Sequence, residues 1–347
     1  MKKFLKIKLY TPGPLEYYPF VKKAMKNTLH HRSKEFSRMM TRIRKNFSEI
    51  LKSDPPIMLP SSGTGAINAV FQNFIDSNKK ILLLSSGKFA NRILKIMEFY
   101  KIEPTIVIAN PGDVFNSDKI PNKKFDYIFM TYVETSTATR NNVEEIAAFL
   151  KQRNSDIKVI VDAVSAFGAY KIYPEKVGID VLIGAPHKAL GCPPGISFIW
   201  YSKKMKFLEP KDFYFNLQEE AKKQEKDLQF RFTPPVETVS ALDASLDYVA
   251  SNFLEFIMLH KKRAEIFRRE IEKQGLELFS KSPANTLTSV KVKNADKIIE
   301  RLKEEGFLVS KGSESYENTL RISHMGDVKI NELKNIAKMI KKYETGK

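Results

Sequence analysis

The sequence predicts an α/β protein with a large domain built on a mostly parallel sheet and a smaller C-terminal α+β domain. Strand-like and helix-like segments alternate from about residue 57 to residue 200. The strand-like segments are almost continuously apolar, which is typical of a sheet covered by helices on both faces. Beyond about residue 240 the pattern changes to long helices and short strands. A chain of 347 residues is long enough to build two cores.

The large domain is predicted from an ordered series of such segments. Helices are expected at 65–75, 88–100 and 143–153, each following a strand or a small-residue turn. The expected strands are at 56–62, 79–86, 104–110, 125–133, 157–163, 181–185 and 195–202. Apolar strands joined by helical crossovers indicate a parallel sheet.

The C-terminal part is predicted to begin with one long helix over 239–274 that bridges the two domains. After it come expected strands at 285–292, 307–310 and 319–324, and helices at 295–306 and 330–343. We assign residues 1–20 to an N-terminal arm, 21–250 to the large cofactor-binding domain and 251–347 to the small domain. The cleft between two such domains is the default place for a binding site.

The composition and charge of the chain limit which kinds of partner are expected. The chain has 58 Lys and Arg against 40 Asp and Glu, a net charge of +18. The basic residues are spread as pairs, as in "HKKRAEIFRREIEKQ", so we expect anionic small substrates and no nucleic acid. No apolar run approaches ~18 residues, so no membrane span is expected. A single cysteine, Cys192, excludes a disulfide framework and a cysteine-rich metal site, and with no export signal it indicates a cytoplasmic protein.

Two residues at predicted strand ends carry the chemistry. Lys188 lies in "GAPHKALGCPPG", just beyond the strand 181–185, and Asp162 ends the strand 157–163. In open α/β sheets, ligands and reactive side chains usually lie at the carboxyl ends of the strands. A strand-end lysine or aspartate alone is more often a surface residue or a turn cap. Together they indicate pyridoxal 5'-phosphate (PLP), which needs a lysine for a Schiff base and a carboxylate that keeps its pyridine nitrogen protonated.

Three turns add candidate cofactor contacts. In "PSSGTGAINAV" (60–70), Ser62, Gly63 and Thr64 open a predicted helix and offer N–H groups and hydroxyls to a phosphate. Phe89 in "SSGKFANRI" can stack on a planar ring, and Thr135 in "YVETSTATRNN" can bond a ring substituent. Each of these turns is a common feature by itself. The prediction of a PLP site rests on their occurring together.

At this point the sequence resembles the class V, fold-type I PLP-dependent aminotransferases, in the alanine–glyoxylate / serine–pyruvate branch. The resemblance runs from 11 to 326, nearly the whole chain. The matching stretches are "TPGP", "HRSKEF", "SSGTGA", "SGKFANR", "ETSTA", "VDAVSAFG", "GAPHKALGCPPG", "FTPPVETV" and "RISHMG". They are specific for the superfamily and much less specific for a substrate.

The resemblance implies roles for the cofactor residues. Lys188 would form the Schiff base and then move a proton at the substrate's α-carbon, and Asp162 would bind the pyridine nitrogen. Val164 would pack on the ring face opposite Phe89. At the position of Phe89, family members carry Trp. Ser62, Gly63 and Thr64 would hold the phosphate together with His187, where this branch usually has Gln.

The resemblance also implies residues outside these turns. Thr233 would reach across a homodimer interface to the partner's phosphate, so that each active site is shared. Phe230 stands where some members have a phosphate-binding Tyr. Arg321 would grip the substrate α-carboxylate through its planar fork, with Gly13 close to the same carboxylate. His30, His31 and Arg32 would line the mouth of the site.

The implied activity is a ping-pong transfer of an amino group from alanine or serine to a 2-oxo acid, glyoxylate or pyruvate. A 2-aminoethylphosphonate–pyruvate transaminase stays open, because such enzymes share "RFTPP" and a basic chain suits a phosphonate. A cysteine desulfurase is disfavoured, since Cys192 lies in a structural turn. A non-enzymatic cofactor-binding or nucleic-acid-binding protein is disfavoured by the joint presence of Lys188, Asp162 and Arg321.

Overall fold

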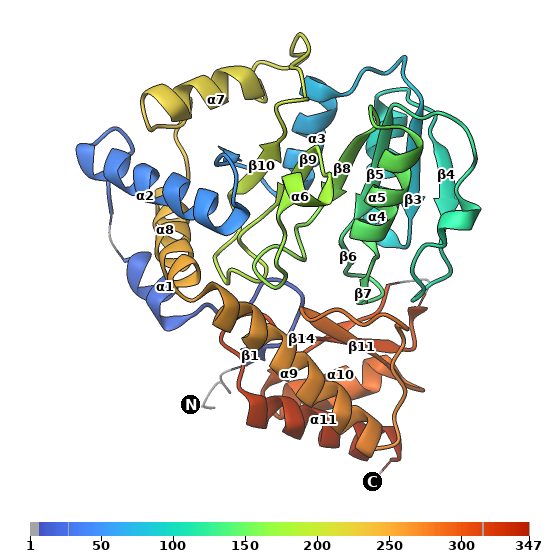
Figure 1. Ribbon diagram of the computed structural model, residues 1–347. Coiled ribbons are helices and arrows are strands. Elements are labelled where there is room, and N and C mark those ends of the chain that lie inside the picture. The colour runs from blue at the N-terminus through green and yellow to red at the C-terminus, as the bar shows by residue number, and fades with distance from the viewer. Residues whose placement is uncertain (1–6, 27, 314–315, 347) are drawn as a thin grey trace.

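The computed structural model describes residues 7–26, 28–313 and 316–346 (Figure 1). It is an α/β structure, as predicted. Its helices are α1 (Pro19–Ala24), α2 (Lys34–Leu51), α3 (Gly63–Phe74), α4 (Lys88–Phe99), α5 (Val143–Arg153), α6 (Pro174–Val177), α7 (Leu217–Lys226), α8 (Val236–Ser251), α9 (Phe253–Lys273), α10 (Ala295–Glu304) and α11 (Ile330–Glu344). Its strands are β1 (Lys8–Leu9), β2 (Ile57–Leu59), β3 (Ile81–Ser85), β4 (Thr105–Ile108), β5 (Tyr127–Thr131), β6 (Val133–Glu134), β7 (Thr139–Arg140), β8 (Lys158–Asp162), β9 (Val181–Gly184), β10 (Ser197–Tyr201), β11 (Leu287–Lys291), β12 (Phe307–Leu308), β13 (Ser310–Lys311) and β14 (Thr319–Ser323).

The central sheet has seven strands in the order β2-β10-β9-β8-β5-β3-β4. From β9 to β4 every neighbouring pair is parallel, and β10 is antiparallel to both β9 and β2. The prediction of a mostly parallel sheet is therefore confirmed. Asp162, the last residue of β8, pairs in register with Thr131 of β5 and Ile183 of β9. The carboxyl ends of these three strands consequently meet at one edge.

Both faces of this sheet are covered, because successive strand residues point to opposite sides. In β8, Val159 and Val161 join a core formed with α2, α5 and α8, whereas Ile160 joins a second core formed with α3, α4 and α7. All three side chains are fully buried. This explains why the strands read as uninterrupted apolar runs in the sequence.

A smaller unit lies below the large sheet in Figure 1. Its three-stranded antiparallel sheet has the order β11-β14-β13. Apolar side chains of α9, α10, α11 and this sheet form a separate core. Strand β1 pairs in parallel with β12, so the N-terminal segment is attached to this unit, and Tyr10 enters its core. This strand pairing was not predicted from the sequence.

The prediction of one continuous helix over 239–274 is wrong. The structure has two helices, α8 and α9, separated at Asn252, whose backbone leaves the helical region with φ −133° and ψ 38°. The Asn252 side-chain amide donates to the carbonyl of Tyr248 at 2.9 Å. Asparagine side chains bond to nearby backbone and so favour helix ends over helix interiors, which accounts for the break.

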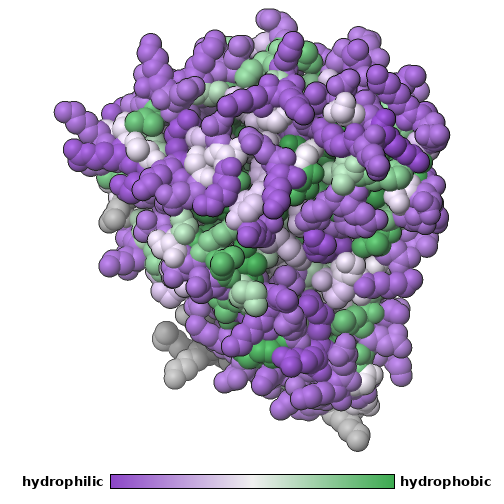
Figure 2. Space-filling model, viewed as in Figure 1, coloured by the Kyte–Doolittle hydropathy of each residue, from purple (hydrophilic) through white to green (hydrophobic). Residues whose placement is uncertain are grey.

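The face of the molecule in Figure 2 is predominantly hydrophilic, with hydrophobic residues in small areas. This matches a chain in which 28% of residues are charged. Within the described residues, no helix combines the length and the apolar character that crossing a membrane requires.

Candidate active site

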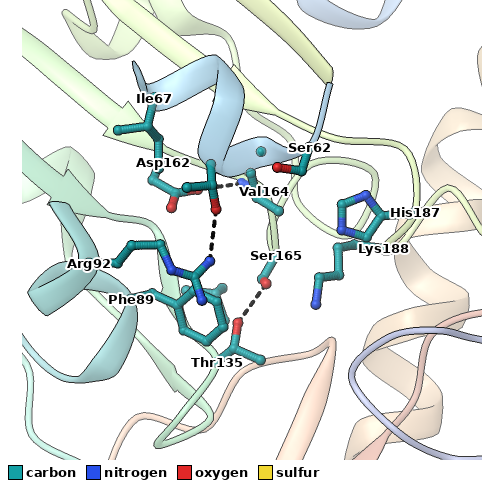
Figure 3. A pocket seen from close by; sticks show the side chains of 13 residues that line it. Ser62, Ile67, Phe89, Arg92, Thr135, Asp162, Val164, Ser165, His187 and Lys188 are labelled. Carbon is teal, nitrogen blue, oxygen red and sulfur yellow. Dashed lines mark hydrogen bonds between the residues drawn. The ribbon is translucent and has the colours of Figure 1, made fainter. Parts of the chain in front are cut away.

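A cavity of about 210 Å³ opens at the carboxyl edge of the central sheet (Figure 3). It gathers residues from five segments that follow strands β2, β3, β5, β8 and β9 and lie far apart in the sequence. Nine predicted cofactor residues line it: Ser62, Gly63, Thr64, Phe89, Thr135, Asp162, Val164, His187 and Lys188. Ile67, Arg92, Val133 and Ser165 also line the cavity and were not predicted.

Lys188 lies in the loop that follows β9, and its side chain is only 8% exposed. Its Nζ donates a hydrogen bond to the carbonyl of Pro12 at 2.5 Å. Burial and, after it, the nearby positive charge of Arg321 lower the pKa of Lys188 to about 8. About a tenth of the amine is therefore unprotonated at pH 7, and this is the form that attacks a carbonyl carbon.

Asp162 projects from the end of β8 into the same cavity. One carboxylate oxygen accepts a hydrogen bond from the Val164 backbone N–H at 2.9 Å. Burial raises the pKa of Asp162 to about 6, and the buried carboxylate of Glu134 acts in the same direction, while Arg92 and Lys188 oppose the rise. A protonated pyridine nitrogen is a partner that would restore the ionised form.

The start of α3 forms an anion cradle. Ser62 is the N-cap, and its Oγ accepts from the Gly65 N–H at 3.3 Å. The N–H groups of Gly63 and Thr64 lie in the first helical turn and have no intrahelical acceptor. A Cβ on Gly63 would lie 2.7 Å from Cγ2 of Val164, so only glycine fits there. This cradle suits a phosphate.

His187 supports the same assignment. It lines the cavity beside the cradle, and its Nδ1 is buried without a hydrogen-bond partner among the described residues. Burial and, to a smaller extent, the positive charge of Lys188 lower the pKa of His187 to about 4. The ring is therefore neutral at pH 7. A buried polar nitrogen without a partner is costly, and a phosphate or its bound water would satisfy it. The donor set therefore fits PLP.

A buried carboxylate that was not predicted holds the aromatic wall in place. Glu134, from β6, accepts hydrogen bonds from the backbone N–H groups of Phe89 at 3.2 Å and Ala90 at 3.3 Å, at the start of α4. It also accepts from the Ser136 hydroxyl at 2.6 Å. Burial raises the pKa of Glu134. An acidic residue in "YVETSTATRNN" was visible, but nothing in the sequence indicated that it bonds to α4.

On the same turn, Thr135 forms a hydroxyl–hydroxyl hydrogen bond with Ser165 at 2.6 Å. Arg92, one turn into α4, donates from Nη1 to Oγ1 of Thr64 at 3.0 Å. In the sequence, Arg92 could be linked to the site only by its position three residues after Phe89, which places both on one face of the predicted helix. In a chain with 58 basic residues, that spacing did not single it out.

Arg321, from β14 of the small unit, does not line this cavity, but it is near enough for its positive charge to act on Lys188. Its Nη1 donates to the Thr135 carbonyl at 3.2 Å and its Nε to the Lys311 carbonyl at 2.9 Å, which fixes the plane of the guanidinium. Gly13 is close as well: its φ is +144°, and a Cβ there would lie 3.3 Å from the Lys188 Nζ. Both predicted substrate residues are thus next to Lys188.

Thr233 is predicted to reach the partner's phosphate across a dimer interface. In the single chain it is exposed and does not line the cavity. His30, His31 and Arg32 do not line its mouth either. Arg32 instead donates to the backbone carbonyls of Phe230 and Arg231 at 2.8 and 3.0 Å, which ties the start of α2 to the segment before Thr233.

Cys192 is fully buried, and burial raises the pKa of its thiol to about 12. The thiol is therefore protonated and enclosed, which is the opposite of a nucleophilic cysteine. Among the described residues there is also no group of His, Cys, Asp and Glu side chains arranged to hold a metal ion.

Comparisons with known proteins agree with the family that the sequence resembles. A family model described as "Aminotransferase class-V" matches residues 14–336. Alanine–glyoxylate aminotransferase 1 of Saccharomyces cerevisiae is 28% identical, with 96% of each chain covered. The 2-aminoethylphosphonate–pyruvate transaminase of Phocaeicola vulgatus is 26% identical, covering 96% of this chain and 98% of its own.

Among solved structures, an aspartate aminotransferase of subgroup IV from Thermus thermophilus has a TM-score of 0.91 at 22% identity. The match covers 98% of this chain and 99% of that one. The same arrangement of large sheet and small unit therefore extends over nearly the whole of both chains.

Proposed function

The chain belongs to the class-V aminotransferases, which are PLP-dependent enzymes, and from this premise we propose that it moves an amino group from alanine or serine to glyoxylate or pyruvate. The observation that carries the proposal is the position of Arg321, held by two backbone carbonyls beside Lys188. A guanidinium in that place suits the carboxylate of a small amino acid or 2-oxo acid.

PLP supplies an aldehyde that takes up the amino group and a ring that withdraws electrons from the substrate's α-carbon. The residues of this chain do the rest. Lys188 Nζ would take a proton from the α-carbon of the amino donor and, in the second half of the reaction, would give a proton to the α-carbon of the 2-oxo acid. Asp162 would hold a proton on the pyridine nitrogen, and the α3 cradle with His187 would hold the phosphate.

Substitution Arg321→Lys is expected to lower kcat/KM by ~100-fold for the amino donor and for the oxo acid, mainly through KM. A lysine keeps the charge but cannot form two parallel hydrogen bonds to a carboxylate. Steady-state kinetics with both substrates varied would measure this. An unchanged KM for both substrates would place their carboxylates elsewhere, and unchanged affinity for PLP serves as the control.

The donor is identified by mixing PLP-loaded protein with L-alanine, L-serine, glycine, L-cysteine and 2-aminoethylphosphonate and following the cofactor absorbance in a stopped-flow instrument. Rapid change with alanine or serine, reversed by glyoxylate or pyruvate, is the expected result. The phosphonate is the second candidate, supported by the Phocaeicola relative and by the net charge of +18. Reaction with 2-aminoethylphosphonate alone would select it.

We also propose a homodimer in which Thr233 completes the partner's phosphate site, because Thr233 is exposed in the single chain. Thr233→Ala is then expected to weaken PLP binding by about tenfold, the loss of one hydrogen bond to a charged group. Thr41, an exposed threonine on α2, gives the control Thr41→Ala. A monomer in analytical ultracentrifugation, or equal PLP affinity in both variants, would contradict this proposal.

A further inference from the structure

Arg92 connects two walls of the cavity. Its Nη1 donates to the Thr64 hydroxyl at 3.0 Å, and its guanidinium carbon lies 4.7 Å from the centroid of the Phe89 ring (Figure 3). Thr64 belongs to the anion cradle at the start of α3, whereas Phe89 is the aromatic residue in the first turn of α4. One side chain thus contacts both a phosphate-binding residue and a ring-stacking residue.

The chemistry of the side chain matters for this double contact. A guanidinium is planar, so it can stack on an aromatic ring while its edge donates a hydrogen bond. A lysine ammonium has no plane and cannot do both from the same position. Arg92 also lies near enough to Asp162 and Lys188 that its positive charge lowers the pKa of each. It therefore faces the centre of the cavity as well as its walls.

We propose that Arg92 is a positioning residue for the cofactor. Arg92 fixes the Phe89 ring relative to the Thr64 hydroxyl, so that the cofactor's pyridine ring and its phosphate are bound at the same time. Arg92 acts through these two residues. The inference depends on PLP binding and on no particular amino donor. It remains testable if the proposed donors prove wrong.

The structure offers a matched control for simple helix packing. Tyr100, at the end of α4, donates from its hydroxyl to Oδ1 of Asn68 in α3 at 2.8 Å. This hydrogen bond joins the same two helices as Arg92 does, but neither residue lines the cavity. Tyr100→Phe therefore removes one α3–α4 hydrogen bond without touching the cofactor site.

The experiment compares Arg92→Met, Arg92→Lys, Tyr100→Phe and Lys95→Met. Lys95 is an exposed cation three residues further along α4, so its variant controls for loss of charge. Two readouts are taken without turnover: the affinity of the apoprotein for PLP by absorbance titration, and the induced circular dichroism of the bound cofactor, which reports ring orientation.

Arg92→Met is expected to weaken PLP binding by about tenfold and to reduce the induced dichroism. Arg92→Lys should recover part of the affinity but not the dichroism, while Tyr100→Phe and Lys95→Met stay within about twofold of the wild type. The inference is overturned if Arg92→Met matches the wild type, if Arg92→Lys restores both readouts, or if Tyr100→Phe or Lys95→Met loses as much as Arg92→Met. A different amino donor in the stopped-flow panel would alter none of these results.

Discussion

Replacing Lys188 with alanine is expected to lower kcat for amino transfer by ~10⁴-fold or more. The residue supplies both the amine that holds the cofactor aldehyde and the base that moves the proton, and general acid–base catalysis alone contributes ~10²–10⁴-fold. Lys188 is suited to both tasks because burial and Arg321 lower its pKa to about 8. Single-turnover absorbance with alanine and PLP-loaded protein measures the loss.

The control for this variant tests which lysine forms the covalent bond to the cofactor. Borohydride reduction of the wild type should fix PLP to the peptide that contains Lys188, and mass spectrometry of Lys188→Ala should show no fixed cofactor. Affinity for PLP should fall less than kcat, because the α3 cradle and Asp162 are intact in the variant. Cofactor fixed to a different lysine, or kcat within tenfold of the wild type, would show that Lys188 is not the catalytic amine.

Substitution Asp162→Asn should lower kcat by ~10³-fold and at the same time make the apoprotein more stable at pH 7–8. The amide has the same shape but cannot hold a proton on the pyridine nitrogen, which removes the electrostatic support for the reaction. The gain in stability has a separate cause. Folding raises the pKa of Asp162 from 3.8 to about 6, because the charged carboxylate is buried.

The sign of the stability change follows from this shift. Below pH 3.8 Asp162 is protonated in the folded and unfolded chain, and it carries no penalty. As pH rises from 3.8 towards 6 only the unfolded chain loses the proton, so the stability of the wild type falls. Above about pH 6 the penalty is complete and amounts to about 3 kcal/mol.

Thermal unfolding of the apoprotein across this pH range tests the prediction. Asp162→Asn should have the higher Tm at pH 7–8, and the difference should shrink as pH falls below 6. The neighbouring variant Ser165→Ala, in the same cavity, should show no such pH dependence. A lower Tm for Asp162→Asn at pH 8 would mean that the ionised carboxylate is stabilised in the apoprotein, and activity close to the wild type would exclude the proposed role.

The parallel sheet and the turns that carry Lys188, Asp162 and the Ser62–Thr64 cradle could be predicted from the amino-acid sequence. Apolar strand runs and the small residues after them are local signals, and a parallel sheet necessarily collects the carboxyl ends of its strands at one edge. Gathering these turns in one cavity therefore followed from the sheet alone. Their roles follow from the resemblance to the family, and the variants described above test them.

The contacts between helices and strands could not be predicted from the sequence and became visible in the three-dimensional structure. Arg92 and Glu134 connect α3, β6 and α4, and neither stood out among residues of the same type in the sequence. The pairing of β1 with β12 was missed for a related reason, whereas the end of α8 at Asn252 has a local cause, the hydrogen bond from its side chain to Tyr248. A side chain's partner across two elements depends on how those elements pack, and helical periodicity carries no information about that packing.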